Sequence, residues 1–158
     1  DPSMKVAISC DHAAFHLKEA IRAHLEERGI PYHDFGIYAA DEKRDYPYAS
    51  FYACQAIQAG ECDLGIVMCG TGVGVSMAAN KMAGIRAACC SDYFSAKYTR
   101  AHNDANVLCM GERVVGAGLA IELADVFLDT PFEGGRHARR VAQIAAIEGG
   151  NLAPESIE

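Results

Sequence analysis

One cysteine, Cys69, stands where a buried strand should pass into a glycine-rich turn. Residues 64–68 form a short apolar run, which is typical of a strand buried on both faces. Gly70, Gly72 and Gly74 follow at every second position, ahead of a run that can be helical. Such a turn directs several backbone N–H groups toward the positive end of a helix dipole, which favours bound negative charge. Because the same field favours thiolate over thiol, we predict that Cys69 acts as a base or nucleophile while the loop amides stabilise charge on a substrate.

Other interpretations of this loop fit less well. A dinucleotide-binding fingerprint would need a third glycine at Val75 or Met77, and a Walker loop would need a lysine that is not there. A phosphatase cradle that pairs cysteine with arginine would need the arginine at Val75. The remaining alternative is a glycine-rich connection beside a cysteine that is merely buried.

Polar side chains at other places could join Cys69. Asp11 and His12 come directly after the apolar run 6–10. Asp11 could equally cap the following helix, or do both. His102 and Asn103 lie where a helix should end before a strand, so they either cap that helix or contribute to a site.

Two arginines lie one helical turn apart near the end of the chain. Arg136 and Arg140 follow a Gly-Gly pair, so both guanidiniums should lie on one face of a helix. Two guanidiniums at a helix start can hold a phosphate through charge-assisted hydrogen bonds. The alternative is a solvated basic face. Asp45-Tyr46-Pro47 and Gly111-Glu112-Arg113 are weaker signals, and each could be only a turn.

The elements that must position these residues alternate between strand and helix. We expect five strands, at 6–10, 31–35, 64–68, 85–90 and 107–110. The helices are expected at 13–28, 46–60, from the glycine loop to about 82, 93–101, 118–128 and 135–147. This alternation predicts an α/β fold: a three-layer, doubly wound, Rossmann-like parallel sheet of five strands with helices on both faces.

The predicted fold divides the candidate residues between two rims. Ligands bind beyond the carboxyl ends of the strands in such sheets, where Asp11 and Cys69 should meet. His102 precedes a strand and should therefore lie at the opposite rim. If His102 meets Cys69 at all, the cysteine must come from another subunit, which predicts a homo-oligomer with shared sites.

Composition limits the class of protein. The chain of 158 residues has length for one domain, expected at 4–148, with a loose tail at 149–158. Residues 1–3 look like a cloning remnant ahead of Met4. Seven cysteines without a pairing framework, and no signal peptide before the first strand, favour reduced thiols in the cytoplasm. We expect Cys89, Cys90 and Cys109 to be core residues.

The same composition speaks against several partners. The net charge of −7 gives no global electrostatic support to nucleic-acid binding. The sequence contains no apolar run long enough to span a membrane, so we expect no membrane association. It also lacks a paired cysteine set with zinc spacing, and we expect no metal in the site.

The ordered set of motifs resembles the ribose/galactose sugar-phosphate isomerase family, and within it the type B ribose-5-phosphate isomerases. The resemblance covers about residues 4–147. It rests on Cys10-Asp11-His12, Asp45-Tyr46-Pro47, Cys69-Gly70-Thr71-Gly72-Val73-Gly74, Ala78-Ala79-Asn80-Lys81, the run His102–Val107, Gly111-Glu112-Arg113 and Gly135-Arg136-His137-x-x-Arg140.

The resemblance implies interconversion of ribose 5-phosphate and ribulose 5-phosphate through a cis-enediolate, without a cofactor or metal. It implies that Cys69 is the base, that Thr71 bonds the substrate oxygens O1 or O2, and that His102 opens the sugar ring. The amides of Gly70, Gly72 and Gly74 would hold the enediolate oxygen. Substrate contacts would come from Asp11, Asn103 and Tyr46 on the sugar, and from His12, Arg113, Arg136 and Arg140 on the phosphate.

The resemblance also implies a homodimer or homotetramer with active sites between subunits. Family members that use a glutamate base carry it where this chain has Val75, so the chain belongs with the cysteine-based branch. Isomerisation of a six-carbon substrate, allose 6-phosphate or galactose 6-phosphate, stays open. So do a non-catalytic phosphosugar-binding subunit and, less well supported, a phosphatase that uses Cys69.

Overall fold

The computed structural model describes residues 4–156, and the expected remnant at residues 1–3 lies outside them. Its sheet has five strands: β1 (Val6–Cys10), β2 (Tyr32–Asp34), β3 (Leu64–Cys69), β4 (Ala87–Cys89) and β5 (Val107–Gly111). Their order is β2-β1-β3-β5-β4, and every neighbouring pair is parallel. The predicted doubly wound parallel sheet is therefore confirmed.

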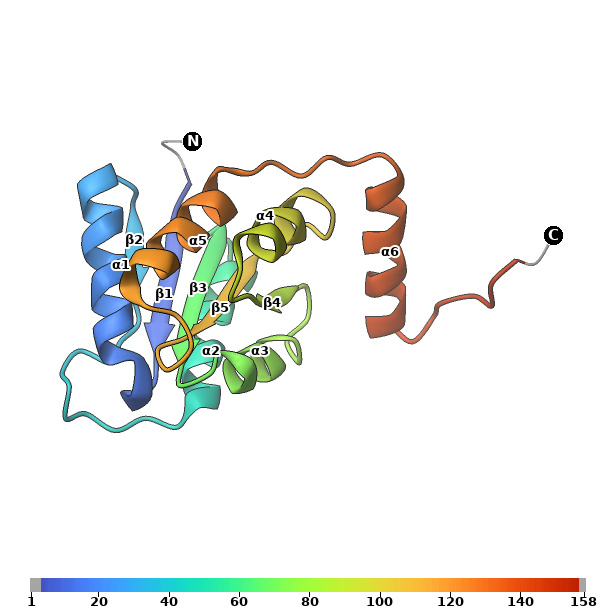
Figure 1. The fold of residues 1–158 in the computed structure, drawn as a ribbon. Helices are drawn as coiled ribbons and strands as arrows, with labels where there is room; N and C mark the ends of the chain where they lie inside the picture. Colours follow the sequence, from blue (N-terminus) through green and yellow to red (C-terminus); the bar gives the residue numbers. More distant parts are fainter. Residues whose placement is uncertain (1–3, 157–158) are drawn as a thin grey trace.

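Helices cover both faces of this sheet (Figure 1). One face carries α1 (Phe15–Arg28), α4 (Tyr93–Ala101) and α5 (Ala117–Asp129), and the other carries α2 (Tyr46–Gln58) and the short α3 (Val73–Ala79). Successive residues of each strand point to opposite faces. Ile8 accordingly packs into the first layer, whereas Ala7 packs into the second.

Local signals in the sequence set the helix boundaries. Gly29 ends α1 in the left-handed conformation, with φ of 70° and its N–H bonded to the carbonyls of Leu25 and Glu26. Asp92 caps α4 by accepting a hydrogen bond of 2.7 Å from the backbone N–H of Ser95. Pro47 lies in the first turn of α2, where its missing N–H costs nothing.

Three elements differ from their predicted bounds. The helix expected from residue 13 begins as a 3-10 turn, η1 (His12–Ala14). The helix expected to reach residue 82 ends at Ala79, because the Asn80 side chain bonds both backbone groups of Ala87 instead. The predicted strand 85–90 also shortens, to Ala87–Cys89, and the Ile85 N–H closes a turn on the Met82 carbonyl instead.

The last helix, α6 (Arg136–Glu148), stands at the β4 edge, apart from the layers that cover the sheet (Figure 1). Its only buried residue is His137. The Glu148 carboxylate accepts a hydrogen bond of 3.2 Å from the Gly84 amide, which ties the far end of α6 to the body. The expected loose tail has no helix or strand over residues 151–156.

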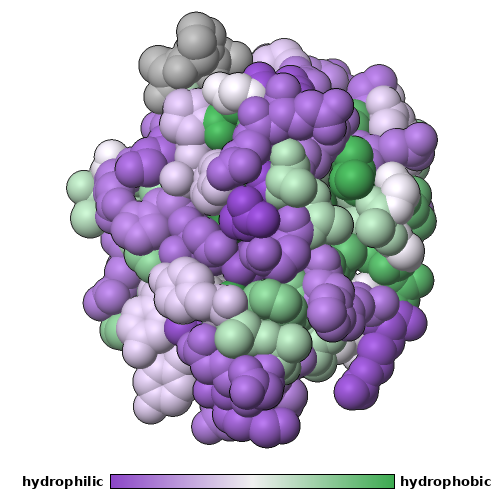
Figure 2. All heavy atoms as spheres, turned by 90° about the vertical axis from the view of Figure 1, so that its left-hand side faces the viewer, coloured by the Kyte–Doolittle hydropathy of each residue, from purple (hydrophilic) through white to green (hydrophobic). Residues whose placement is uncertain are grey.

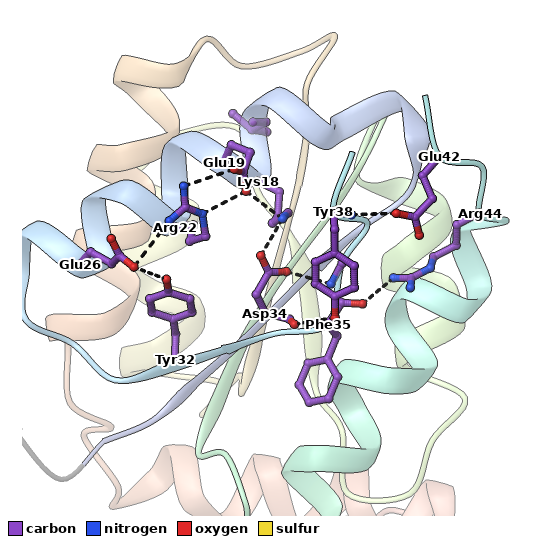
Figure 3. Close-up of polar contacts among 12 residues, drawn as sticks. Lys18, Glu19, Arg22, Glu26, Tyr32, Asp34, Phe35, Tyr38, Glu42 and Arg44 are labelled. Atoms are coloured by element: carbon purple, nitrogen blue, oxygen red, sulfur yellow. Dashed lines mark hydrogen bonds and ion pairs between the residues drawn. The ribbon is translucent and has the colours of Figure 1, made fainter. Parts of the chain in front are cut away.

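A buried ion pair fixes the opposite edge. The Lys18 ammonium is fully buried and lies 2.7 Å from Asp34 and 2.9 Å from Glu19, joining α1 to β2 (Figure 3). Burial alone would lower the pKa of Lys18, but the hydrogen bonds to Asp34 and Glu19 outweigh it and raise the pKa. The outer surface of this edge is mostly hydrophilic (Figure 2). None of the helices within residues 4–156 is long and apolar enough to cross a membrane.

Candidate active site

Cys69 is the last residue of β3, and its side chain is 5% exposed. The backbone N–H of Gly72 points at its Sγ atom over 3.2 Å. The next amide, that of Val73, donates to Oγ1 of Thr71 over 3.1 Å. One amide of the turn thus contacts the sulfur, and Thr71 lies at the surface.

Close packing explains two of the loop glycines. Gly72 has a φ of 83°, and a β-carbon there would lie 2.8 Å from the carbonyl carbon of Met110. At Gly74 a β-carbon would lie 2.6 Å from the ring of Tyr46. No side chain fits at either position without a shift, so the loop lies directly against the end of β5 and against Tyr46.

Asp11 and Arg113 lie on the same rim as this loop. The Asp11 carboxylate caps η1 by accepting a hydrogen bond of 2.9 Å from the Ala13 amide, which confirms the capping interpretation. Burial raises the pKa of Asp11, against the opposing effects of the Ala13 amide and of the charges on His12 and Arg113. The Arg113 side chain passes over Gly70, since its Nη1 would lie 3.7 Å from a β-carbon there.

The loop between β2 and α2 holds His12. Arg44 donates a hydrogen bond of 2.9 Å to the carbonyl of Phe35, so the loop is tied to the end of β2 (Figure 3). The Arg44 carbonyl in turn lies 3.0 Å from Nδ1 of His12. Sequence reasoning missed Arg44, because a backbone carbonyl that orients a side chain leaves no signal in residue type.

His102 and Asn103 lie at the other rim, as predicted. Cys69 pairs with Gly111 at the end of β5, whereas His102 precedes the first residue of β5. The length of β5 alone separates these ends by roughly 13 Å. Within one chain the structure does not bring His102 to Cys69.

The arginines of α6 belong to the His102 side. Arg136 and Arg140 are exposed, one turn apart in the first half of the helix. Between them His137 stacks on His102, with ring centroids 3.9 Å apart and planes inclined by 6°. Burial and the nearby charges of His102, Arg136 and Arg140 lower the pKa of His137, while Glu133 opposes them.

The structure therefore sorts the predicted residues into two groups. One surrounds the end of β3 and holds Asp11, His12, Tyr46, Cys69, Gly70, Thr71, Gly72, Gly74 and Arg113. The other lies around the end of α4 and the start of α6, and holds His102, Asn103, Arg136 and Arg140.

One thiol was placed wrongly. Cys89 is exposed, not a core residue, because β4 is an edge strand whose end lies beside the loop. Its Sγ is 3.7 Å from the Thr71 carbonyl oxygen, so it borders the candidate site. Cys90 and Cys109 are buried, as predicted.

Comparisons with known proteins agree with these observations. Residues 6–144 match the Ribose/Galactose Isomerase family. The chain is 51% identical to ribose-5-phosphate isomerase B of Escherichia coli over 91% of its own length and 96% of that protein. It is 39% identical to a D-erythrulose-4-phosphate isomerase of Pectobacterium atrosepticum, over 92% of this chain and 95% of the relative.

A solved structure of the same family has a similar fold. The ribose-5-phosphate isomerase B of Clostridium thermocellum superposes with a TM-score of 0.90 at 48% identity, covering 93% of this chain and 99% of the other. The order of motifs, the sheet and these matches lead to one conclusion: the chain belongs to the Ribose/Galactose Isomerase family.

Proposed function

We propose that this protein interconverts ribose 5-phosphate and ribulose 5-phosphate, with Cys69 as the base. The observation that carries the proposal is the contact between the Gly72 amide and the Cys69 sulfur, at the end of a parallel strand. The relative at 51% identity is named for the five-carbon substrate, whereas the D-erythrulose-4-phosphate isomerase is 39% identical. The higher identity favours the pentose.

In the proposed reaction the Cys69 thiolate removes the proton from C2 of the open-chain aldose. The electron pair of that C–H bond forms the C1–C2 double bond, and negative charge moves to O1. The Cys69 thiol then returns its proton to C1, and the proton of O2 moves to O1, which gives the ketose and regenerates the thiolate. Thr71 lies at the surface beside Cys69, where its hydroxyl can bond O1 or O2.

The loop amides would stabilise the negative charge of the enediolate intermediate. A backbone N–H that bonds the developing oxyanion is typically worth about 3–4 kcal/mol in the transition state. Gly70 and Gly74 would supply such groups, while the Gly72 amide faces the Cys69 sulfur, and close packing on β5 and Tyr46 holds the loop in place before substrate arrives. Asp11 would accept hydrogen bonds from sugar hydroxyls, while His12 and Arg113 add positive charge for the phosphate.

The remaining steps require the second group of residues. Only the open-chain aldehyde can enolise, and His102 is the residue we assign to ring opening. Because His102 lies at the opposite rim of its own chain, we propose that it acts with Cys69 of a second copy. Asn103, Arg136 and Arg140 would enter the same shared site, in a homodimer or homotetramer.

Replacement of the thiol tests the base. Cys69→Ala should abolish formation of ribulose 5-phosphate in a coupled assay, while ribose 5-phosphate still binds in calorimetry. Cys62→Ala is the matched control, because Cys62 is a buried thiol that precedes β3, whereas Cys69 ends that strand. Full turnover by the Cys69→Ala variant would refute the assignment of the base.

Mixing two inactive variants tests the sharing of sites. In a hybrid dimer of Cys69→Ala and His102→Ala chains, one shared site keeps both Cys69 and His102, and the other has lost both. Co-refolded mixtures should therefore recover about a quarter of the wild-type activity, since half of the dimers are hybrids with one intact site each. Mixtures that stay inactive although hybrids form would place each site within one chain.

Relative kcat/KM values for four-, five- and six-carbon sugar phosphates test the substrate. We expect ribose 5-phosphate to be preferred. A higher value for erythrulose 4-phosphate, allose 6-phosphate or galactose 6-phosphate would change the substrate but keep the family.

A further inference from the structure

Two imidazoles and one carboxylate converge at the end of the sheet opposite Cys69. His102 follows α4, Glu133 lies in the connection to α6, and His137 lies in the first turn of α6. Nε2 of each histidine is 3.6 Å from Oε1 of Glu133. The potential ligand atoms of all three residues lie within 4.8 Å of one another.

Backbone contacts build this cluster. The Glu133 N–H donates a hydrogen bond of 2.9 Å to the carbonyl of Ala101, so the connection is fixed onto the last turn of α4. Figure 1 shows this connection crossing from α5 past α4 before it enters α6. A Gly-Gly turn follows, and the His137 N–H closes it with a bond of 3.0 Å to the Gly134 carbonyl.

One atom of the cluster is buried without a partner. His137 is 6% exposed, and its Nε2 has no hydrogen bond to any residue of 4–156. A buried polar atom left unpaired destabilises the folded chain. The same atom faces Glu133, whose side chain is 53% exposed. The cluster therefore holds one buried, unpaired nitrogen beside a carboxylate that is open to solvent.

We propose that His102, Glu133 and His137 form a binding site for a divalent cation of the zinc class. Imidazole nitrogens and a carboxylate oxygen are ligands that zinc accepts at about 2.0–2.2 Å, which puts tetrahedral ligand atoms about 3.3 Å apart. The two separations of 3.6 Å from Glu133 are close to that spacing, and the rings, which stack with planes inclined by 6°, must turn out of the stack before both nitrogens point at one ion. Calcium and magnesium prefer sites made of oxygen atoms alone.

The open side of the site leaves the fourth coordination position to water. Because His102 is also the residue assigned to ring opening, a bound ion would withdraw it from substrate. This consequence rests on the proposed function, whereas binding of the metal does not. The cation would thus act as an inhibitor of turnover on the cyclic sugar.

Cobalt(II), a coloured substitute for zinc, tests binding without any substrate. The reduced full-length protein should bind one Co²⁺ and show visible d–d absorption without the near-ultraviolet charge-transfer bands of a cobalt–thiolate bond. Glu133→Gln and His137→Asn should each weaken binding about tenfold or more. Matched controls are Glu122→Gln and His16→Asn, which change an exposed carboxylate and an exposed imidazole elsewhere and should bind as the wild type does.

Each result decides the proposal. The proposal is overturned if d–d absorption is absent, if cobalt–thiolate bands appear, or if the Glu133→Gln variant binds as tightly as the wild type. Glu133 is half-exposed, so its replacement tests the site even if His137→Asn fails to fold. In the coupled assay, Glu133→Gln should raise the Zn²⁺ concentration for half-inhibition about tenfold. Cobalt binding without zinc inhibition would leave the metal site standing and remove His102 from the reaction.

Discussion

The geometry of the glycine loop predicts the cost of one methyl group at Gly72. This residue has a φ of 83°, a conformation that costs an L-residue about 1–2 kcal/mol. The new β-carbon of Gly72→Ala would also lie 2.8 Å from backbone carbon of Met110 and 3.1 Å from Sγ of Cys89. Overpacking of this kind typically costs a further ~1–3 kcal/mol.

A matched variant separates these two effects. Gly60 has nearly the same φ, 77°, but a β-carbon there would meet nothing within 4 Å. Gly60→Ala should therefore lose only the conformational part, about 1–2 kcal/mol. Gly72→Ala should lose about 2–5 kcal/mol in total, because the contact with β5 is added.

Urea unfolding at one fixed protein concentration measures both values. The same samples should differ in the coupled assay, since a shift of residue 72 moves the amide that points at the Cys69 sulfur. Gly60→Ala should keep its turnover. The reasoning fails if Gly72→Ala is no less stable than Gly60→Ala, because the tight contact with β5 would then be absent in solution.

Other perturbations test the edge of the sheet and the thiols. Asp34→Asn should cost about 3–5 kcal/mol of unfolding free energy, because it removes the closest partner of a fully buried ammonium, whereas the double variant Lys18→Met/Asp34→Leu, which removes both charges, should be nearly neutral. Because the pKa of Lys18 is raised on folding, its contribution is complete below pH ~10.5 and is lost as pH rises through the folded-state pKa. An alkaline titration should therefore destabilise the wild type more than the double variant, and equal slopes would contradict the pairing. Iodoacetamide should label Cys89 before Cys54, since Cys89 is exposed whereas burial raises the pKa of Cys54 to about 12; mass spectrometry of peptides would show the reverse order if Cys89 were a core residue.

Much of the fold follows from local patterns in the sequence. The apolar run 64–68 depends only on neighbouring residues, and the structure places β3 there, one residue longer. The cap at Asp92 and the stop at Gly29 are equally local. The parallel sheet follows from the alternation of such elements. The Asn80 clamp on Ala87 was missed because it joins two elements, and residue order does not reveal contacts of that kind.

The site residues also divide into those that local patterns could place and those that only contacts in the folded chain could place. Cys69 and Asp11 were placed on one rim because strand ends in a parallel sheet share an edge. Cys89 was misplaced because an apolar run looks alike in a central and in an edge strand, and only strand order tells them apart. Glu133 carries no motif, and its approach to His102 depends on a backbone bond to Ala101.

The predicted site residues lie in two groups, one at each rim of the sheet. This arrangement favours a site shared by two chains over a wrong assignment of the residues. Residues assigned by mistake should scatter over the surface, but these gather in two places, one with the thiol and one with His102. Each group brings its own cations, Arg113 to the first and the guanidiniums of α6 to the second. The second group is also carried by a helix that buries one residue in its own chain and leaves Ile144 and Ile147 exposed. Exposed apolar side chains on a helix gain free energy when a neighbouring molecule covers them. We propose that the contact that covers α6 also brings its arginines and His102 to the Cys69 of a second copy.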